Sequence, residues 1–190
     1  MLVIGLAGFA ASGKTEIANY LKEKHSFKIL EFSSVIEEEA RKMKLIEGEL
    51  SMEEKKRKLS EVGALIREYY KNEAIFAELL VKKILSENFD RVVIPGFRSV
   101  YEVETFRRAF GGKFLLIWVE TDAKLRYERR KIQDQKFNLS FEEFLERDRK
   151  DSLRLGMDRL KSQANFTIFN NSSIDDLKKN IDEILENLKI

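Results

Sequence analysis

The chain has 190 residues, of which 43% are hydrophobic and 11% aromatic, which suffices for one well-buried core but not for two ordinary domains. Its 35 basic residues nearly balance 33 acidic ones, and the two signs interleave along the sequence, which disfavours a general nucleic-acid binder. The absence of cysteine and a single histidine, His25, exclude disulfides, thiolate metal sites and histidine clusters. Any metal must therefore be bound by oxygen ligands.

The first apolar run, residues 2–7, lacks the basic flank and the length of a secretory signal, and no apolar run approaches the ~18 residues of a membrane span. We therefore expect a cytoplasmic protein without a membrane partner. The sequence is compatible with a monomer or a homodimer.

Five apolar runs of strand length alternate with longer polar stretches of helical periodicity. They cover residues 2–7, 28–32, 91–94, 114–119 and 166–169. Short buried strands separated by helices predict an α/β fold with an open parallel sheet. Helix starts are predicted where a serine precedes an acid by three residues, the capping-box spacing, at Ser34/Glu37, Ser51/Glu54, Ser99/Glu102, Ser140/Glu143 and Ser173/Asp176.

Two connections are too long for simple crossovers, because ordinary loops in such folds have ~2 to 6 residues. Residues 33–88 are predicted to hold about three helices with apolar faces. Residues 122–163 are rich in Arg and Lys and poor in large aliphatic residues, which predicts a solvated helical hairpin. We read residues 1–190 as one domain that carries these two insertions.

The first run is followed by GFAASGKT, residues 8–15, which matches the phosphate loop (Walker A) pattern GxxxxGK[ST] at every fixed position. Such a loop binds phosphates through converging backbone N–H groups and the positive end of the following helix. We expect Gly8, Ala10, Ala11, Ser12 and Gly13 to form this cradle, because glycine permits the conformations and close approaches that it needs. Lys14 would reach the β and γ phosphates, and the Thr15 hydroxyl would be a ligand of the bridging Mg ion. ATP and Mg are therefore the predicted cofactors.

Other motifs and the length of the chain indicate which class of phosphate-loop protein this is. A Ras-like GTPase needs a guanine-reading NKxD segment, and the sequence has none. Large motor and AAA ATPases need more chain. Size therefore favours a small phosphotransferase in which the two insertions close over acceptor and donor.

With these features the sequence resembles the nucleoside monophosphate kinase-like P-loop kinases, and within them archaeal kinases similar to dephospho-coenzyme A kinase and adenylate kinase. The resemblance covers nearly the whole chain. It rests on the segments GFAASGKT, SSVIEEEARK, GALIREYY, VVIPGFRSVYEVETFRR, YERR and ANFTIFNNSSIDDL. It implies a five-stranded sheet of order 2-3-1-4-5, an acceptor-binding region in residues 33–88 and a lid in residues 122–163.

The resemblance also implies roles for individual residues. Arg67 and Arg98, with Ser34, correspond to the acceptor site, and Asn170 and Asn171 to the loop that borders the base. Arg126, Arg129 and Arg130 correspond to lid residues, of which Arg126 and Arg130 would act on the transferred phosphoryl group. Their spacing places them on one helix face. One alternative stays open for the three lid arginines: a solvated helix face on which they pair with acids such as Glu128. For Arg67 the open alternative is a bridge between two helices. Arg98 follows Gly96 at the carboxyl end of a strand, where open α/β sheets bind ligands.

Three positions depart from the family's pattern. Pro95 stands where an aspartate is usual, and Ser34 and Glu37 stand where an aspartate and an arginine are common. Such changes in charge should alter which acceptor binds. Asp90 and Glu31 lie near strand ends as substitute acids, although Asp90 is at the wrong end of its strand. The sequence identifies no general base.

The leading interpretation is an ATP-dependent kinase that phosphorylates a nucleoside monophosphate or a hydroxyl such as that of dephospho-coenzyme A. Two alternatives stay open: an ATP-binding protein whose acceptor site has decayed, and an NTPase stimulated by a partner.

Overall fold

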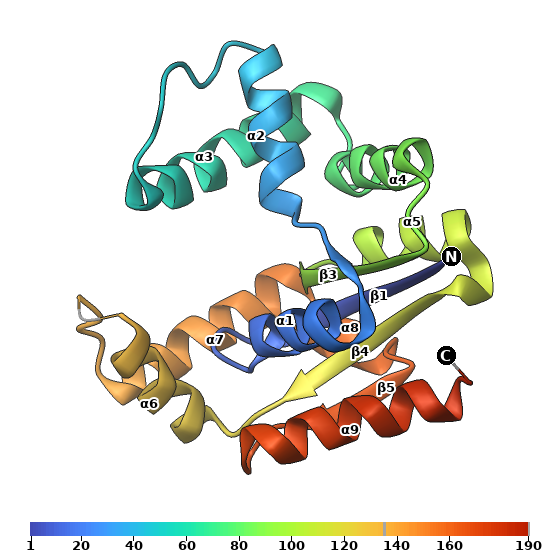
Figure 1. Ribbon diagram of the computed structural model, residues 1–190. Helices are drawn as coiled ribbons and strands as arrows, with labels where there is room; N and C mark the ends of the chain where they lie inside the picture. The colour runs from blue at the N-terminus through green and yellow to red at the C-terminus, as the bar shows by residue number, and fades with distance from the viewer. Residues whose placement is uncertain (135, 190) are drawn as a thin grey trace.

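A parallel sheet forms the centre of the computed structural model, which describes residues 1–134 and 136–189 (Figure 1). Its five strands are β1 (Leu2–Ala7), β2 (Lys28–Ile29), β3 (Arg91–Phe97), β4 (Phe114–Glu120) and β5 (Phe166–Phe169). They follow the order β2-β3-β1-β4-β5, and every pairing is parallel. The predicted fold class and strand order are confirmed.

The second strand is shorter than predicted. β2 ends at Ile29, and Phe32 begins helix α2 (Phe32–Lys42) where the sequence predicted strand. The Phe32 ring packs edge-on against Phe97, with centroids 5.2 Å apart, and contacts Phe106. The apolar side chain of Phe32 thus packs a helix onto a core of aromatic rings. Hydrophobic periodicity alone cannot distinguish such a helical position from a strand position.

The third strand is longer than predicted, because it continues through Pro95 and Gly96. Leu6 pairs with Pro95 and Ala7 with Phe97, so Gly96 is an extra residue in a bulge, with φ of 102°. A bulge tolerates a proline and re-aims the residues after it. Phe97 is completely buried, while Arg98 is exposed at the carboxyl end of the strand.

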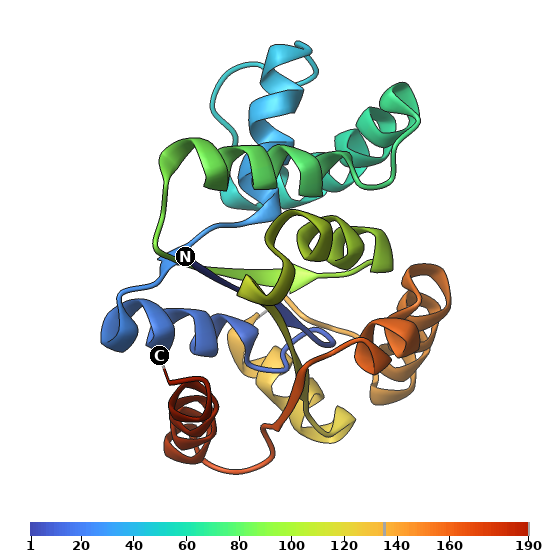
Figure 2. The same cartoon turned by 90° about the vertical axis from the view of Figure 1, so that its right-hand side faces the viewer.

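Helices cover both faces of the sheet. On one face lie α1 (Lys14–His25) and α9 (Ile174–Asn187), below the strands in Figure 2. Their buried side chains form one core with the strands. On the other face, α4 (Ile75–Glu87), α5 (Val100–Phe110) and α8 (Met157–Ser162) contribute to a second core. A 3-10 turn, Gly111–Lys113, links α5 to β4.

The two long connections are helical. Between β2 and β3 lie α2, α3 (Met52–Tyr70) and α4, at the top of Figure 1, as the sequence predicts. Between β4 and β5 lie α6 (Ala123–Gln133), α7 (Phe141–Leu155) and α8. Within residues 1–134 and 136–189, no helix combines the length and the apolar character that crossing a membrane requires.

Four of the five predicted capping boxes are confirmed, at Ser51, Ser99, Ser140 and Ser173. The prediction at Ser34 is wrong. Helix α2 begins earlier, with Glu31 at the N-cap position, and the Ser34 hydroxyl donates to the Glu31 carbonyl at 2.8 Å. The early start follows from the burial of Phe32 against the aromatic core.

Candidate phosphate-binding site

The phosphate loop connects the carboxyl end of β1 to the first turn of α1. Gly8, Ala11 and Gly13 all have positive φ, of 140°, 59° and 101°, and Gly13 is the N-cap of α1. When residues with positive φ alternate with residues of negative φ, successive backbone N–H groups point toward one place, and the dipole of the following helix adds positive potential there. The geometry is that of an anion cradle.

The two fixed glycines lie where a larger residue would collide with its surroundings. A Cβ at Gly8 would lie 2.5 Å from the Val119 carbonyl oxygen, and one at Gly13 would lie 2.2 Å from Asn170 Nδ2. The backbone at Gly8 thus lies close against β4, and that at Gly13 lies close against the segment after β5. Glycine is therefore required by both packing and backbone conformation.

Replacement of Gly8 by alanine is expected to destabilise the protein by about 2 kcal/mol or more, because the Val119 carbonyl is fixed in the sheet and φ is unfavourable for alanine. Gly112→Ala is the matched control, since a Cβ there has no neighbour within 4 Å and φ is not positive. Denaturant unfolding of both variants measures the difference. Equal stability of the two variants would contradict the close packing of the loop.

The side chain of Lys14 folds back over the loop. Its Nζ donates to the carbonyl oxygens of Gly8 and Phe9, at 2.8 and 2.7 Å, and to Ser12 Oγ at 3.2 Å. Burial, followed by the positive charges of Arg98 and Arg126, lowers the pKa of Lys14 from 10.5 to about 8. Three cationic side chains thus share this site, which favours a multiply charged anion.

A measurable pH dependence follows from this buried charge. Below about pH 8 Lys14 is charged in both states, so the folded state bears the full cost of burying it. Between pH 8 and 10.5 only the unfolded chain keeps this proton, so stability rises with pH. Lys14→Met removes this charge from the folded state. The free energy of unfolding of the variant minus that of the parent should therefore be larger at pH 7 than at pH 10, by on the order of 2 kcal/mol. If the difference in free energy of unfolding between variant and parent were equal at both pH values, Lys14 would not be a buried charge.

Of the three arginines that the resemblance assigns to a lid, Arg126 forms a hydrogen bond to the phosphate loop. Its side chain is 5% exposed and forms an ion pair with Asp148 on α7, Nη2 to Oδ2, at 2.6 Å. Nε donates to the Thr121 carbonyl at 3.0 Å, and Nη1 donates to the Ala10 carbonyl at 3.5 Å. The guanidinium also lies over the Phe9 ring, 5.0 Å from its centroid. Arg126 is therefore held beside the phosphate loop.

The other two arginines of this predicted lid have different partners. Arg129 Nη2 donates to the Asn170 carbonyl at 3.1 Å, and its buried Nη1 has no hydrogen-bond partner among the described residues. Arg130 pairs with Asp134 at 2.9 Å and lies over Phe137, both within the second insertion. Of the three, Arg126 contacts the phosphate loop and Arg129 the Asn170 segment.

The loop is supported from two neighbouring strand ends. The Ser12 carbonyl accepts hydrogen bonds from Thr121 Oγ1, at 3.0 Å, and from Asn170 Nδ2, at 2.8 Å. The Asn171 side chain accepts a hydrogen bond from the Asp122 backbone N–H and donates one to Asp122 Oδ1, at 2.9 Å in each case. Asn170 thus lies against the loop, whereas Asn171 ties the segment after β5 to the segment after β4.

Thr15 lies exposed in the first turn of α1, next to the cationic cluster. Its hydroxyl suits one position in the shell of a Mg ion that otherwise takes phosphate oxygens and waters. Among the described residues, no group of three or more acidic, histidine or cysteine side chains could hold a metal ion. The residues present therefore fit a Mg ion that arrives with a nucleotide.

The predicted acceptor residues lie on separate elements. Arg98 follows β3 and is close enough to Lys14 to lower the pKa of that lysine. Arg67 on α3 lies over the Phe76 ring, with 4.8 Å between the guanidinium carbon and the centroid. Ser34 is bonded back to its own helix. Glu37, an acid where an arginine is common, forms ion pairs with Lys55 and Arg41, so its charge is compensated.

Sequence reasoning missed two residues that the structure brings to the loop. Thr121 directly follows β4, and its place at the carboxyl end of a strand could have predicted it. Asp148 lies in the highly charged segment LERDRK of α7, where nothing distinguishes it from solvated neighbours. Its role is visible only through its ion pair with Arg126.

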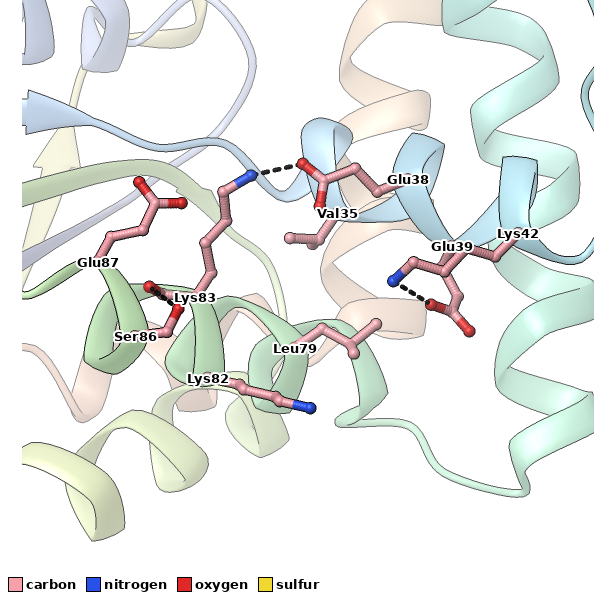
Figure 3. Close-up of a pocket in the computed structure, with 9 residues that line it drawn as sticks. All are labelled: Val35, Glu38, Glu39, Lys42, Leu79, Lys82, Lys83, Ser86 and Glu87. Atoms are coloured by element: carbon pink, nitrogen blue, oxygen red, sulfur yellow. Dashed lines mark hydrogen bonds and ion pairs between the residues drawn. The ribbon is translucent and has the colours of Figure 1, made fainter.

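A separate pocket of about 270 Å³ lies between α2 and α4, lined by acidic and basic side chains that include Glu38 and Lys83 (Figure 3). Lys83 and Glu38 form an ion pair across it. A shallower pocket of about 630 Å³ lies between α4 and α5. Neither includes a residue of the phosphate loop, so both are distinct from the cationic site.

The comparisons with known proteins agree with this architecture. Residues 4–151 match the family model described as AAA domain. A UPF0200 protein from Saccharolobus solfataricus is 33% identical over 188 residues, which cover 97% of this chain and 92% of that protein. The chain belongs to the UPF0200 family. Another UPF0200 protein, from Sulfurisphaera tokodaii, is 32% identical, with 98% of this chain and 97% of the relative covered.

Solved structures similar to this UPF0200 chain include small-molecule kinases. Shikimate kinase from Acinetobacter baumannii, in complex with shikimate, has a TM-score of 0.63 and 20% identity, and covers 100% of this chain and 96% of its own. A gluconokinase from Sinorhizobium meliloti has a TM-score of 0.58 and 12% identity, with 99% and 95% covered. These similarities confirm the P-loop kinase fold that the sequence resemblance implies.

Proposed function

We propose that the protein is an ATP-dependent phosphotransferase that acts on a small acceptor. The observation that carries this proposal is the convergence of Lys14, Arg98 and Arg126 on the phosphate loop, since the positive charges of both arginines act on Lys14. Phosphoryl transfer depends mostly on positioning and charge neutralisation, and this site supplies both. The fold shared with small kinases supports the same reaction class.

The donor site consists of the loop and its supports. Backbone N–H groups of residues 8–15 would bind the β and γ phosphates, with Lys14 turning from loop carbonyls toward them. Thr15 would complete the shell of a Mg ion, which supplies neutralisation of phosphate charge. Arg129 and Asn170 would border the base, because they are bonded to each other beside the loop. We favour adenine as the base of the bound nucleotide.

The acceptor site is proposed to lie between the carboxyl end of β3 and helix α3, where Arg98 and Arg67 would bind anionic groups of the acceptor. Residues 33–88 would form the acceptor-binding region, and residues 122–163 the lid. Arg126 would stabilise the charge that develops on the transferred group, and Arg130 would join it if the lid moves and its pair with Asp134 opens. Nucleoside monophosphates and dephospho-coenzyme A fit this description.

The experiment is phosphoryl transfer from Mg-ATP across ribo- and deoxynucleoside monophosphates and dephospho-coenzyme A, with product identified by mass. Transfer to one acceptor class, with slow hydrolysis in its absence, is the expected result. ATP binding without transfer to any acceptor would favour the alternative of a decayed acceptor site, in keeping with Pro95 and Ser34. Rapid hydrolysis without acceptor would favour a partner-stimulated NTPase.

A further inference from the structure

A buried carboxylate lies at the proposed acceptor site without a role in the proposal so far. Glu102, in the first turn of α5, is 6% exposed. Its Oε2 accepts hydrogen bonds from the backbone N–H groups of Arg98, at 2.7 Å, and Ser99, at 3.1 Å. Both bonds use one oxygen, and among the described residues no hydrogen bond to Oε1 is formed. One carboxylate oxygen is therefore left for a ligand.

The charges that surround Glu102 are those of the acceptor site. Arg67, from α3, and Arg98, after β3, are the charged groups that act on it electrostatically. Arg98 also acts on Lys14. Arg98 thus acts on both the donor lysine and Glu102, which associates the carboxylate with the phosphate loop and with the residues proposed to bind the acceptor.

Of the other carboxylates near the loop, Glu16 in the first turn of α1 is only half-buried, and three more are engaged or exposed. Asp148 is paired with Arg126. Glu120 accepts from Trp118 Nε1 at 2.6 Å and pairs with Lys161 at 2.7 Å. Glu31, near the end of β2, is exposed and accepts a hydrogen bond from Ser33. Among the carboxylates that the structure describes near the loop, Glu102 combines burial, a free oxygen and a position among the acceptor arginines.

We propose that Glu102 is the general base for a hydroxyl acceptor, and that the acceptor is a small anionic molecule with a free hydroxyl. This inference rests on the proposed function. The hydroxyl proton passes to Glu102 Oε1 as the acceptor oxygen bonds to the γ phosphorus. The bond between that phosphorus and the β–γ bridging oxygen breaks, ADP leaves, and Glu102 then releases the proton to solvent. An acceptor that is already a phosphate would not need this residue.

The raised pKa of Glu102 supports this role. Burial raises it, against the hydrogen bonds from the N–H groups of Arg98 and Ser99 and the charges of Arg67 and Arg98. A carboxylate with a pKa nearer to neutral accepts a proton more effectively. Glu102 also supports the position of Arg98 by accepting its backbone N–H.

Glu102→Gln tests the proposal, because glutamine serves in a capping box as glutamate does but cannot accept the proton. For hydroxyl acceptors we expect kcat to fall about a hundredfold or more, with ATP affinity and melting temperature nearly unchanged, and with loss of the acidic limb of the pH profile. Glu143→Gln is the matched control, since Glu143 forms the same box with Ser140 on the exposed start of α7.

Three outcomes are distinguishable. A parent enzyme that phosphorylates a hydroxyl, with a Glu102-dependent kcat and an unaffected Glu143 variant, supports the base. Equal kcat and pH profiles for the parent and Glu102→Gln, or transfer to phosphate acceptors alone, overturn the base and leave the phosphotransferase. Absence of transfer by the parent to any acceptor, with ATP bound, overturns both.

Discussion

Lys14→Ala is expected to lower the rate of phosphoryl transfer by at least a hundredfold. Lys14 lies over the loop, where it donates to the Gly8 and Phe9 carbonyls, and in the proposed function it would follow the γ-phosphoryl charge into the transition state. Transfer rates and ATP affinity should be measured together. We expect the rate to fall more than the affinity, because the backbone cradle still binds phosphate.

Lys22→Ala is the matched control for this variant, since Lys22 lies exposed on the same helix, α1. Its transfer rate should equal that of the parent. A Lys14→Ala variant that retained most of the parent's rate would show that the loop lysine is not part of the transferring site.

The second large effect is expected for Arg126. Arg126→Ala would leave Asp148, which is 15% exposed, without its partner, and loss of one member of a buried pair costs about 3 kcal/mol. It would also remove a donor from the phosphate site, and transfer should fall about a hundredfold. Denaturant unfolding and transfer kinetics measure the two effects separately.

Two further variants separate stability from catalysis at Arg126. The double replacement of Arg126 by Met and Asp148 by Leu should restore much of the stability, because no charge remains buried, but not the activity. Arg130→Ala should change stability by less than about 1 kcal/mol, since its pair with Asp134 is 37% exposed on both sides. Recovery of activity by the double variant would assign Arg126 a structural role alone.

Much of the fold could be predicted because its signals are local. The GxxxxGK[ST] spacing fixed the strand, loop and helix at the start, and four serine capping boxes marked real helix ends. The errors arose where tertiary contacts decide. Phe32 belongs to a helix because it packs against Phe97, and Pro95 with Gly96 continues β3 through a bulge instead of ending it.

Less of the candidate site could be predicted, because its arrangement depends on tertiary contacts. The spacing of the arginines predicted that all three share one helix face, but only the contacts of the folded chain join Arg126 to the loop, Arg129 to Asn170 and Arg130 to Asp134. Glu102 is recognisable in sequence as a helix cap. Its burial beside Arg98 depends on how α5 packs on the sheet, which no local spacing encodes.

The most direct test of the central claim follows the γ-phosphoryl group of labelled Mg-ATP, with and without each acceptor, in the parent and in Lys14→Ala. We expect the label to move to an acceptor faster than to water, and only when Lys14 is present. Label that reaches water alone, at a rate that no acceptor changes, would contradict this expectation.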